Sequence, residues 1–178
     1  SARGWAHIGV LRALQQAGVA TTVLADLPIP ELEALGDLLP GIAEILPLLP
    51  EDVQQNTLKL VPLMRSQGVE TAYLWQDGGV LTAALAALLA GVPRIVTSFR
   101  GLPPNLRPEL MRPQMPMLFR ELARVPGVSF TANSQATARA YEDWLGLPDG
   151  FIQVLHNAVP EPDPSGGEVE GAIWRGIA

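Results

Sequence analysis

The stretch that decides the fold is Val69–Gly101, which reads VETAYLWQDGGVLTAALAALLAGVPRIVTSFRG. Its first part, Thr71–Gln76, is a short apolar run rich in residues that favour β-strands. The next part, Val80–Ala90, is almost wholly apolar and rich in Ala and Leu, which indicates a helix buried on most sides. Gly91 ends that helix, and Arg94–Ser98 is a second β-rich run.

A strand, a helix and a second strand within about thirty residues form a βαβ unit, whose two strands run parallel. In an open parallel sheet, ligands bind at the carboxyl ends of the strands. Here those ends are the loop after Thr71–Gln76 and the loop after Arg94–Ser98. We therefore predict that the loops contact a ligand through Asp77, Gly78, Gly79, Arg100 and Gly101.

Strands and helices also alternate on both sides of this unit. Upstream we predict helices over Trp5–Ala17, Glu31–Leu39 and Glu51–Gln67, a strand over Thr21–Ala25, and a strand or irregular run over Ile42–Leu46. Downstream we predict a loop over 102–116, helices over Met117–Val125 and Gln135–Leu145, and strands over Val128–Ala132 and Phe151–Leu155. The alternation predicts a three-layer, Rossmann-like α/β domain with a mainly parallel sheet. Because the chain opens on a helix, we expect the first strand of the sheet to precede Ser1.

Composition narrows the function classes. The chain has 178 residues, 48% of them apolar, and no Cys, which excludes disulfides, Cys-zinc sites and thiol catalysis. Its net charge of -6 argues against a general nucleic-acid partner. No apolar run is long enough to predict a membrane span. No cluster of Asp, Glu or His has metal-ligand spacing, so we predict no metal, and no residue stands out as catalytic.

A third candidate contact point is Asn133-Ser134, directly after the strand Val128–Ala132. Side-chain oxygens of these types cap the helix that follows, and its free N–H groups could also hold an anion or a hydroxyl. Each candidate keeps a structural alternative. Asp77-Gly78-Gly79 could be only a turn, Arg100 an exposed loop arginine, and Asn133-Ser134 only a helix cap.

The segment 100–124 carries a separate signal. It holds five Arg against Glu109 and Glu121, a local charge of +3 in a chain of -6, together with several Leu and Met. Basic and apolar residues in a Pro-rich stretch are typical of docking on anionic lipid or on a phosphate-bearing acceptor. The alternative is an ordinary solvated face over core contacts.

Three stretches in order resemble the amino-terminal half of a GT-B glycosyltransferase: GVPRIVTSFRG (91–101), VSFTANSQATARAYEDWLGLP (128–148) and FIQVLHNAVP (151–160). They are most similar to the large retaining group that uses sugar nucleotides. The small-residue start, Ser1–Gly4, resembles that family's loop after its first strand. Two positions depart from the family pattern. Phe99-Arg100 replaces a usual His, and the usual NGVD reads Asn157-Ala158-Val159-Pro160.

The resemblance implies that residues 1–160 are an acceptor-side domain and that 161–178 are a linker and the start of a donor-binding domain. It implies a glycan or lipid-linked acceptor bound at the loops named above, and a hinge at His156 and Asn157. The nucleotide-sugar donor would be a substrate held mainly by the other domain, with no cofactor. The whole enzyme would be a hexosyltransferase of polysaccharide biosynthesis, and this part alone would be inactive.

The absence of Cys is compatible with the cytoplasm, where we expect the protein, and the segment 100–124 suggests peripheral contact with the inner face of the membrane. The main alternative is a non-catalytic α/β module that binds a small molecule. A self-contained hydrolase or nucleotide-dependent enzyme is the other, but the chain has no GxSxG nucleophile elbow and no phosphate-binding GxxxxGK[ST] loop.

Overall fold

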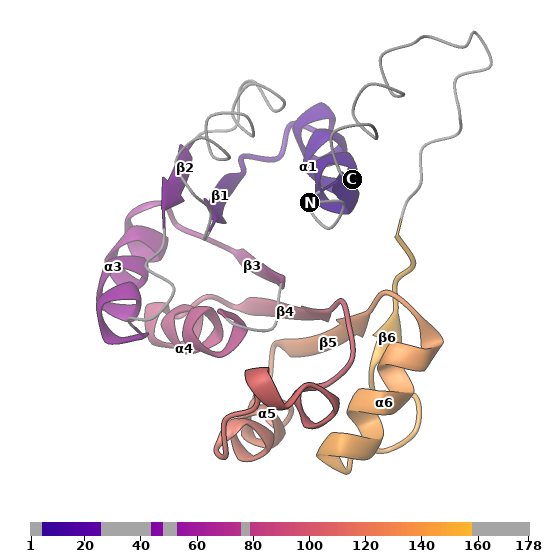
Figure 1. The fold of residues 1–178 in the computed structure, drawn as a ribbon. Coiled ribbons are helices and arrows are strands. Elements are labelled where there is room, and N and C mark those ends of the chain that lie inside the picture. The colour runs from indigo at the N-terminus through magenta and orange to yellow at the C-terminus, as the bar shows by residue number, and fades with distance from the viewer. Residues whose placement is uncertain (1–4, 26–43, 48–52, 76–78, 158–178) are drawn as a thin grey trace, which may run out of the picture. The chain divides into compact units, whose positions relative to one another are not determined.

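A computed structural model of the chain describes residues 5–25, 44–47, 53–75 and 79–157 (Figure 1). The chain divides into two compact units, one formed by Ser1–Leu48 with Asn157–Ala178 and the other by Leu49–His156. The larger unit carries the βαβ stretch and most of the candidate site residues. No helix among the described residues has the length and apolar character needed to cross a bilayer.

In the smaller unit, α1 (Trp5–Gln16) is followed by β1 (Thr22–Ala25) and β2 (Glu44–Pro47). The two strands pair in parallel, with Thr22 opposite Glu44. The helix and the first strand were both predicted within one residue at each end, and β2 lies where the sequence left strand and irregular structure open. The predicted helix Glu31–Leu39 lies outside the described residues.

The larger unit holds a four-stranded sheet in the order β3-β4-β5-β6, and every neighbouring pair is parallel. Its strands are β3 (Thr71–Trp75), β4 (Arg94–Phe99), β5 (Val128–Ala132) and β6 (Gln153–Val154). Figure 1 shows the crossover helices α4, α5 and α6 on one side of this sheet. The predicted α/β class and mainly parallel sheet are confirmed.

The helices of this unit are α3 (Val53–Ser66), α4 (Val80–Ala90), α5 (Met115–Leu122) and α6 (Gln135–Leu145). Two 3-10 turns, η1 (Pro104–Leu106) and η2 (Pro108–Leu110), lie between β4 and α5. Helix α4 ends where Gly91 takes up the left-handed conformation with φ 81°, as predicted from the glycine. Helix α3 packs beside α4, and Arg65 in its last turn donates from Nη2 to the Leu89 carbonyl oxygen at 2.6 Å.

Aromatic side chains fill the layer between the sheet and its helices. Phe99 is 1% exposed and stacks on Tyr141 of α6, with ring centroids 3.8 Å apart. Phe119 of α5 meets Phe99 edge to face at 5.6 Å, and Phe130 of β5 does the same at 5.4 Å. Contacts of this geometry add to the free energy gained by burial. The cluster fixes α5 and α6 against the carboxyl half of β4, next to the predicted ligand edge.

The prediction for α5 was wrong at both ends, because the helix spans Met115–Leu122 rather than Met117–Val125. Pro116 was taken as a helix breaker, but it lies in the first turn, where a missing N–H removes no helical hydrogen bond. At the other end the chain tightens: the N–H groups of Arg124 and Val125 donate three residues back, to Glu121 and Leu122.

The prediction for the last strand was also wrong, because β6 has two residues, Gln153–Val154, rather than five. The preceding N–H groups are engaged elsewhere. Phe151 donates to the Pro148 carbonyl oxygen at 3.1 Å, and Ile152 donates to the buried Glu142 carboxylate at 2.8 Å. The Leu155 N–H faces β5, so in a longer strand the Phe151 N–H would face β5 as well, but the turn at Pro148 takes it.

Candidate functional site

Arg100 and Asn133 lie side by side at the carboxyl edge of the four-stranded sheet. Ser98 of β4 stands opposite Thr131 of β5 in the register, and side chains alternate between the two faces of a strand. Arg100 and Asn133 are the next residues on that same face. Asn133 Nδ2 donates to the Arg100 carbonyl oxygen at 3.5 Å, and the Asn133 N–H donates to the Phe99 carbonyl oxygen at 3.2 Å. The structure therefore brings together two of the predicted contact residues.

The predicted pair Asn133-Ser134 divides into two roles. Ser134 caps α6, since its Oγ accepts from the Thr137 N–H at 3.1 Å and donates to Thr137 Oγ1 at 3.0 Å. Asn133 takes no part in the cap. Its Oδ1 is buried and has no hydrogen-bond partner among the described residues. A buried acceptor without a donor is costly, so this atom is suited to receive a donor from a ligand.

Gly79 stands directly before α4, so it also lies at the carboxyl edge. It is the exposed N-cap residue of that helix, and no side chain of the described residues caps the N–H groups that follow it. Free N–H groups at a helix start can hold an anion or a hydroxyl. Asp77 and Gly78 lie outside the described residues, and their role stays a prediction.

A second arginine lies beside Gly101. The guanidinium of Arg107 lies 3.8 Å from the place where a Cβ at Gly101 would stand, and Arg107 Nε donates to the Leu102 carbonyl oxygen at 3.0 Å. Gly101 is not among the described glycines that have a positive φ. The sequence had singled out Arg100 alone, but the loop after β4 carries two guanidinium groups.

Tyr73 is a site residue that the sequence reasoning missed. It is half-buried on the face that carries Ser98 and Thr131, and its ring meets Trp75 edge to face at 5.0 Å. Burial raises the pKa of Tyr73, but hydrogen bonds from the Ser98 and Thr131 hydroxyls lower it. Trp75 and the positive charge of Arg100 act in the same direction, and the net pKa lies below the ordinary 10.0. The alternation of Tyr73 and Trp75 with apolar Ala72 and Leu74 was the available signal.

This coupling makes a titration sensitive to the position of Arg100. The absorbance of the unaltered full-length protein is compared with that of Tyr73→Phe as the pH is raised. We expect the difference to show that the Tyr73 phenol ionises below its ordinary pKa. Arg100→Ala should raise that pKa, and Arg94→Ala at the other end of β4 should not. Because the folded pKa is the lower one, Tyr73 stabilises the fold above the unfolded pKa, and this contribution is lost as pH falls through the folded pKa. An unchanged titration in Arg100→Ala would contradict the proximity of the two groups.

The predicted hinge residues follow β6. The Leu155 N–H still donates to the Ala132 carbonyl oxygen at 2.8 Å, so the chain runs along β5 for one residue beyond the strand. His156 and Asn157 are both exposed, and the boundary between the two compact units falls between them. Their action as a hinge stays a prediction.

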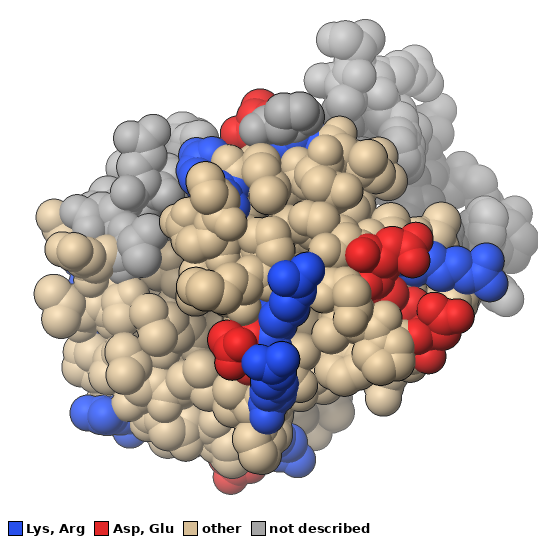
Figure 2. All heavy atoms as spheres, turned by 90° about the horizontal axis from the view of Figure 1, so that it is seen from below, with Lys and Arg blue, Asp and Glu red and all other residues tan. Residues whose placement is uncertain are grey.

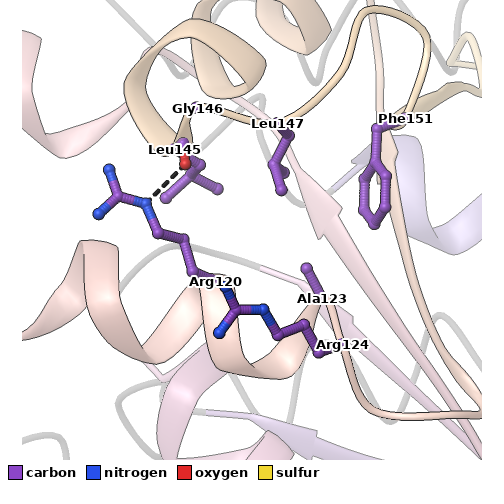
Figure 3. Close-up of a pocket in the computed structure, with 7 residues that line it drawn as sticks. All are labelled: Arg120, Ala123, Arg124, Leu145, Gly146, Leu147 and Phe151. Carbon is purple, nitrogen blue, oxygen red and sulfur yellow. Dashed lines mark hydrogen bonds between the residues drawn. The ribbon is translucent and has the colours of Figure 1, made fainter.

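A hollow of about 340 Å³ lies at the opposite edge, where α5 and α6 end (Figure 3). Arg120 donates from Nε to the Leu145 carbonyl oxygen at 2.6 Å, and Arg124 forms an ion pair with Glu121 at 2.7 Å. Arg120 thus satisfies one of the carbonyl groups left over at the end of α6. Arg120 therefore links the ends of two helices, while Arg124 pairs only with Glu121 three residues earlier, and we place the candidate site at the carboxyl edge.

Comparison with known proteins gives one informative similarity. No protein-family model matches the chain. The chain is similar to the Vi polysaccharide biosynthesis protein VipC/TviE of Salmonella typhi, with 41% identity over 138 residues. The match covers 76% of this chain and 24% of that protein, so the chain spans about a quarter of the relative's length.

Proposed function

We propose that the chain is part of a protein of polysaccharide biosynthesis and that it supplies the acceptor side of a glycosyltransferase. The 41% identity to a protein named for polysaccharide biosynthesis supports the first half. The motifs that resemble the GT-B family support the second half. The parallel sheet, with its polar carboxyl edge, is the architecture in which such a site would lie.

The juxtaposition of Arg100 and Asn133 carries the proposal. A guanidinium offers five donors in a fixed fork, which suits sugar hydroxyls or a phosphate. The buried Asn133 Oδ1 offers an acceptor for a hydroxyl. Tyr73 lies on the same face of the sheet, and the positive charge of Arg100 lowers its pKa. In this proposal these residues bind and orient the acceptor, while a nucleotide-sugar donor is held mainly by a second domain.

Sugar transfer tests the proposal. The full-length protein is incubated with a panel of isotope-labelled sugar nucleotides and with oligosaccharide prepared from the organism's own surface polysaccharide. We expect label to enter the oligosaccharide with at least one donor. The 178-residue chain alone should give no transfer above background, because in this proposal a second domain holds most of the donor.

Turnover by the 178-residue chain would contradict the division into acceptor and donor halves. Binding of oligosaccharide by the full-length protein, with no transfer from any donor, would instead favour the non-catalytic binding module.

A further inference from the structure

Four large apolar side chains stand exposed on two neighbouring segments that the proposed function does not use. They come from the loop after β4, from η1 and from the start of α5. They are Leu102, Leu106, Met117 and Leu118, with exposed fractions of 51%, 56%, 57% and 38%. We call these four residues the apolar rim. Leaving this much apolar surface in water costs free energy, so the rim is suited to contact with a partner.

Buried anchors hold the rim in place. Pro103 and Pro104 are among the fully buried side chains, and they lie between the exposed Leu102 and Leu106 on the same loop. In α5, Met115 and Phe119 point into the core while Met117, between them, faces outward. The rim is therefore displayed by a fixed backbone that is packed from beneath.

The surroundings of the rim are basic. The segment 100–124 has a charge of +3 within a chain of -6, and its Arg112, Arg120 and Arg124 are exposed. Arg124 is paired with Glu121, which leaves Arg112 and Arg120 as the larger contributors to an outward positive field. Figure 2 shows a column of lysine or arginine side chains, with acidic side chains directly to its left and a larger acidic group to its right. The charge thus favours an anionic partner for this part of a chain that is acidic as a whole.

We propose that the apolar rim and the arginines of 100–124 dock the protein on the surface of a bilayer that contains anionic lipid. The four apolar side chains would enter the interface between headgroups and acyl chains, while the arginines meet lipid phosphates. Helix α5 has eight residues, which suits lying on a membrane and not crossing it. The rim begins directly after β4, at the edge that holds Arg100. The proposal stands on these observations and does not depend on sugar transfer.

Vesicle co-sedimentation of the full-length protein tests this docking. The vesicles are pure phosphatidylcholine, or phosphatidylcholine with about a third phosphatidylglycerol. The test variant is the double substitution Leu106→Asp with Met117→Asp. A carboxylate at Met117 falls in the first turn of α5, where negative charge is tolerated well. The matched control is Leu85→Asp with Leu89→Asp on α4, where the leucines are 47% and 51% exposed.

We expect the unaltered protein to bind anionic vesicles about tenfold or more tightly than neutral ones, and binding should weaken as salt is added. The rim variant should lose about tenfold or more in affinity, and the α4 variant less than about twofold. Equal binding to both kinds of vesicle, or equal losses in both variants, would overturn the proposal.

Two further outcomes are decisive. If the rim variant does not fold, the single substitution Leu106→Asp replaces it, because Leu106 is the last residue of η1 and more than half of it is exposed. A several-fold loss of vesicle affinity would then support docking, and unchanged affinity would overturn it. If the unaltered protein self-associates and the rim variant abolishes self-association but not vesicle binding, the rim is a protein interface and the proposal fails.

Discussion

Replacing Arg100 by Ala in the full-length protein is expected to lower kcat/KM for sugar transfer about tenfold or more. That factor corresponds to a loss of about 1.4 kcal/mol or more of transition-state stabilisation. The reason is geometric. Arg100 follows the buried end of β4, lies beside Asn133 at the carboxyl edge, and is close enough to Tyr73 to lower its pKa. Removal of the guanidinium takes away the main positive group of the proposed acceptor site.

Arg94→Ala is the matched control, because Arg94 opens the same strand at the opposite edge. Arg94 is exposed, lies 3.6 Å from the Glu70 carboxylate and donates to Thr71 Oγ1 at 3.1 Å. Loss of the Arg94 side chain should leave kcat/KM unchanged, because Arg94 lies away from the proposed acceptor site. The loss should also cost little unfolding free energy, because exposed ion pairs contribute little to stability. Arg100→Lys should recover only part of the activity, because an ammonium keeps the charge but loses the fork. Full activity in Arg100→Ala would return Arg100 to an ordinary loop residue.

Thermal unfolding separates a lost site from a lost fold. Arg100 is half-buried, so Arg100→Ala should cost about 1 kcal/mol of unfolding free energy or less. A larger loss, with activity falling in proportion to the unfolded fraction, would mean that Arg100 acts on the fold. Activity should instead fall at temperatures where the variant is fully folded.

Gly127→Ala is expected to destabilise the larger unit by about 2–5 kcal/mol. Gly127 has φ 84°, a left-handed conformation that costs a non-glycine residue about 1–2 kcal/mol. In addition, a Cβ there would overlap the Pro93 carbonyl oxygen, which is backbone and cannot rotate away. Relief of such overlap by backbone shifts costs about 1–3 kcal/mol more. The Gly127 carbonyl oxygen also accepts from the Ile95 N–H at 2.9 Å, so a shift would disturb the start of β4.

Gly150→Ala isolates the effect of the overlap. Gly150 has a similar φ of 76°, but no atom lies within 4 Å of the place where its Cβ would stand. It should lose about 1–2 kcal/mol from the left-handed conformation alone. Denaturant unfolding of both variants measures the difference. Equal losses would show that Gly127, before β5, and Pro93, before β4, are not in the close contact that the structure shows.

Three elements were predicted to the residue because their signals are local. Val80–Ala90 and Gln135–Leu145 are each closed by a glycine in the left-handed conformation, and Ser134 caps the second of them. Val128–Ala132 lies between the turn at Gly127 and that cap. Residues that fix one backbone conformation mark their own position in the sequence, whatever packs around them.

The errors arose where tertiary contacts decide. The chain before the short β6 is held by tertiary contacts, since the Glu142 carboxylate, ten residues earlier, accepts from the Ile152 N–H. The site shows the same limit. The βαβ pattern was enough to place Arg100 and Asn133 at one edge, but the register between β4 and β5 puts them on one face. The effect of Arg100 on the pKa of Tyr73 depends on the pairing of neighbouring strands, and no spacing in the sequence reveals that pairing.

Hydrogen exchange of the full-length protein, with and without bound oligosaccharide from the organism's own surface polysaccharide, tests whether the acceptor binds at the carboxyl edge of the sheet. We expect slower exchange in peptides that contain Gly79, Arg100 and Asn133, which are described positions at that edge. Peptides that contain Arg94 and Gly127, at the amino ends of β4 and β5, should exchange as before. Protection confined to the amino edge, or to residues outside this sheet while the oligosaccharide is bound, would contradict an acceptor site at the carboxyl edge.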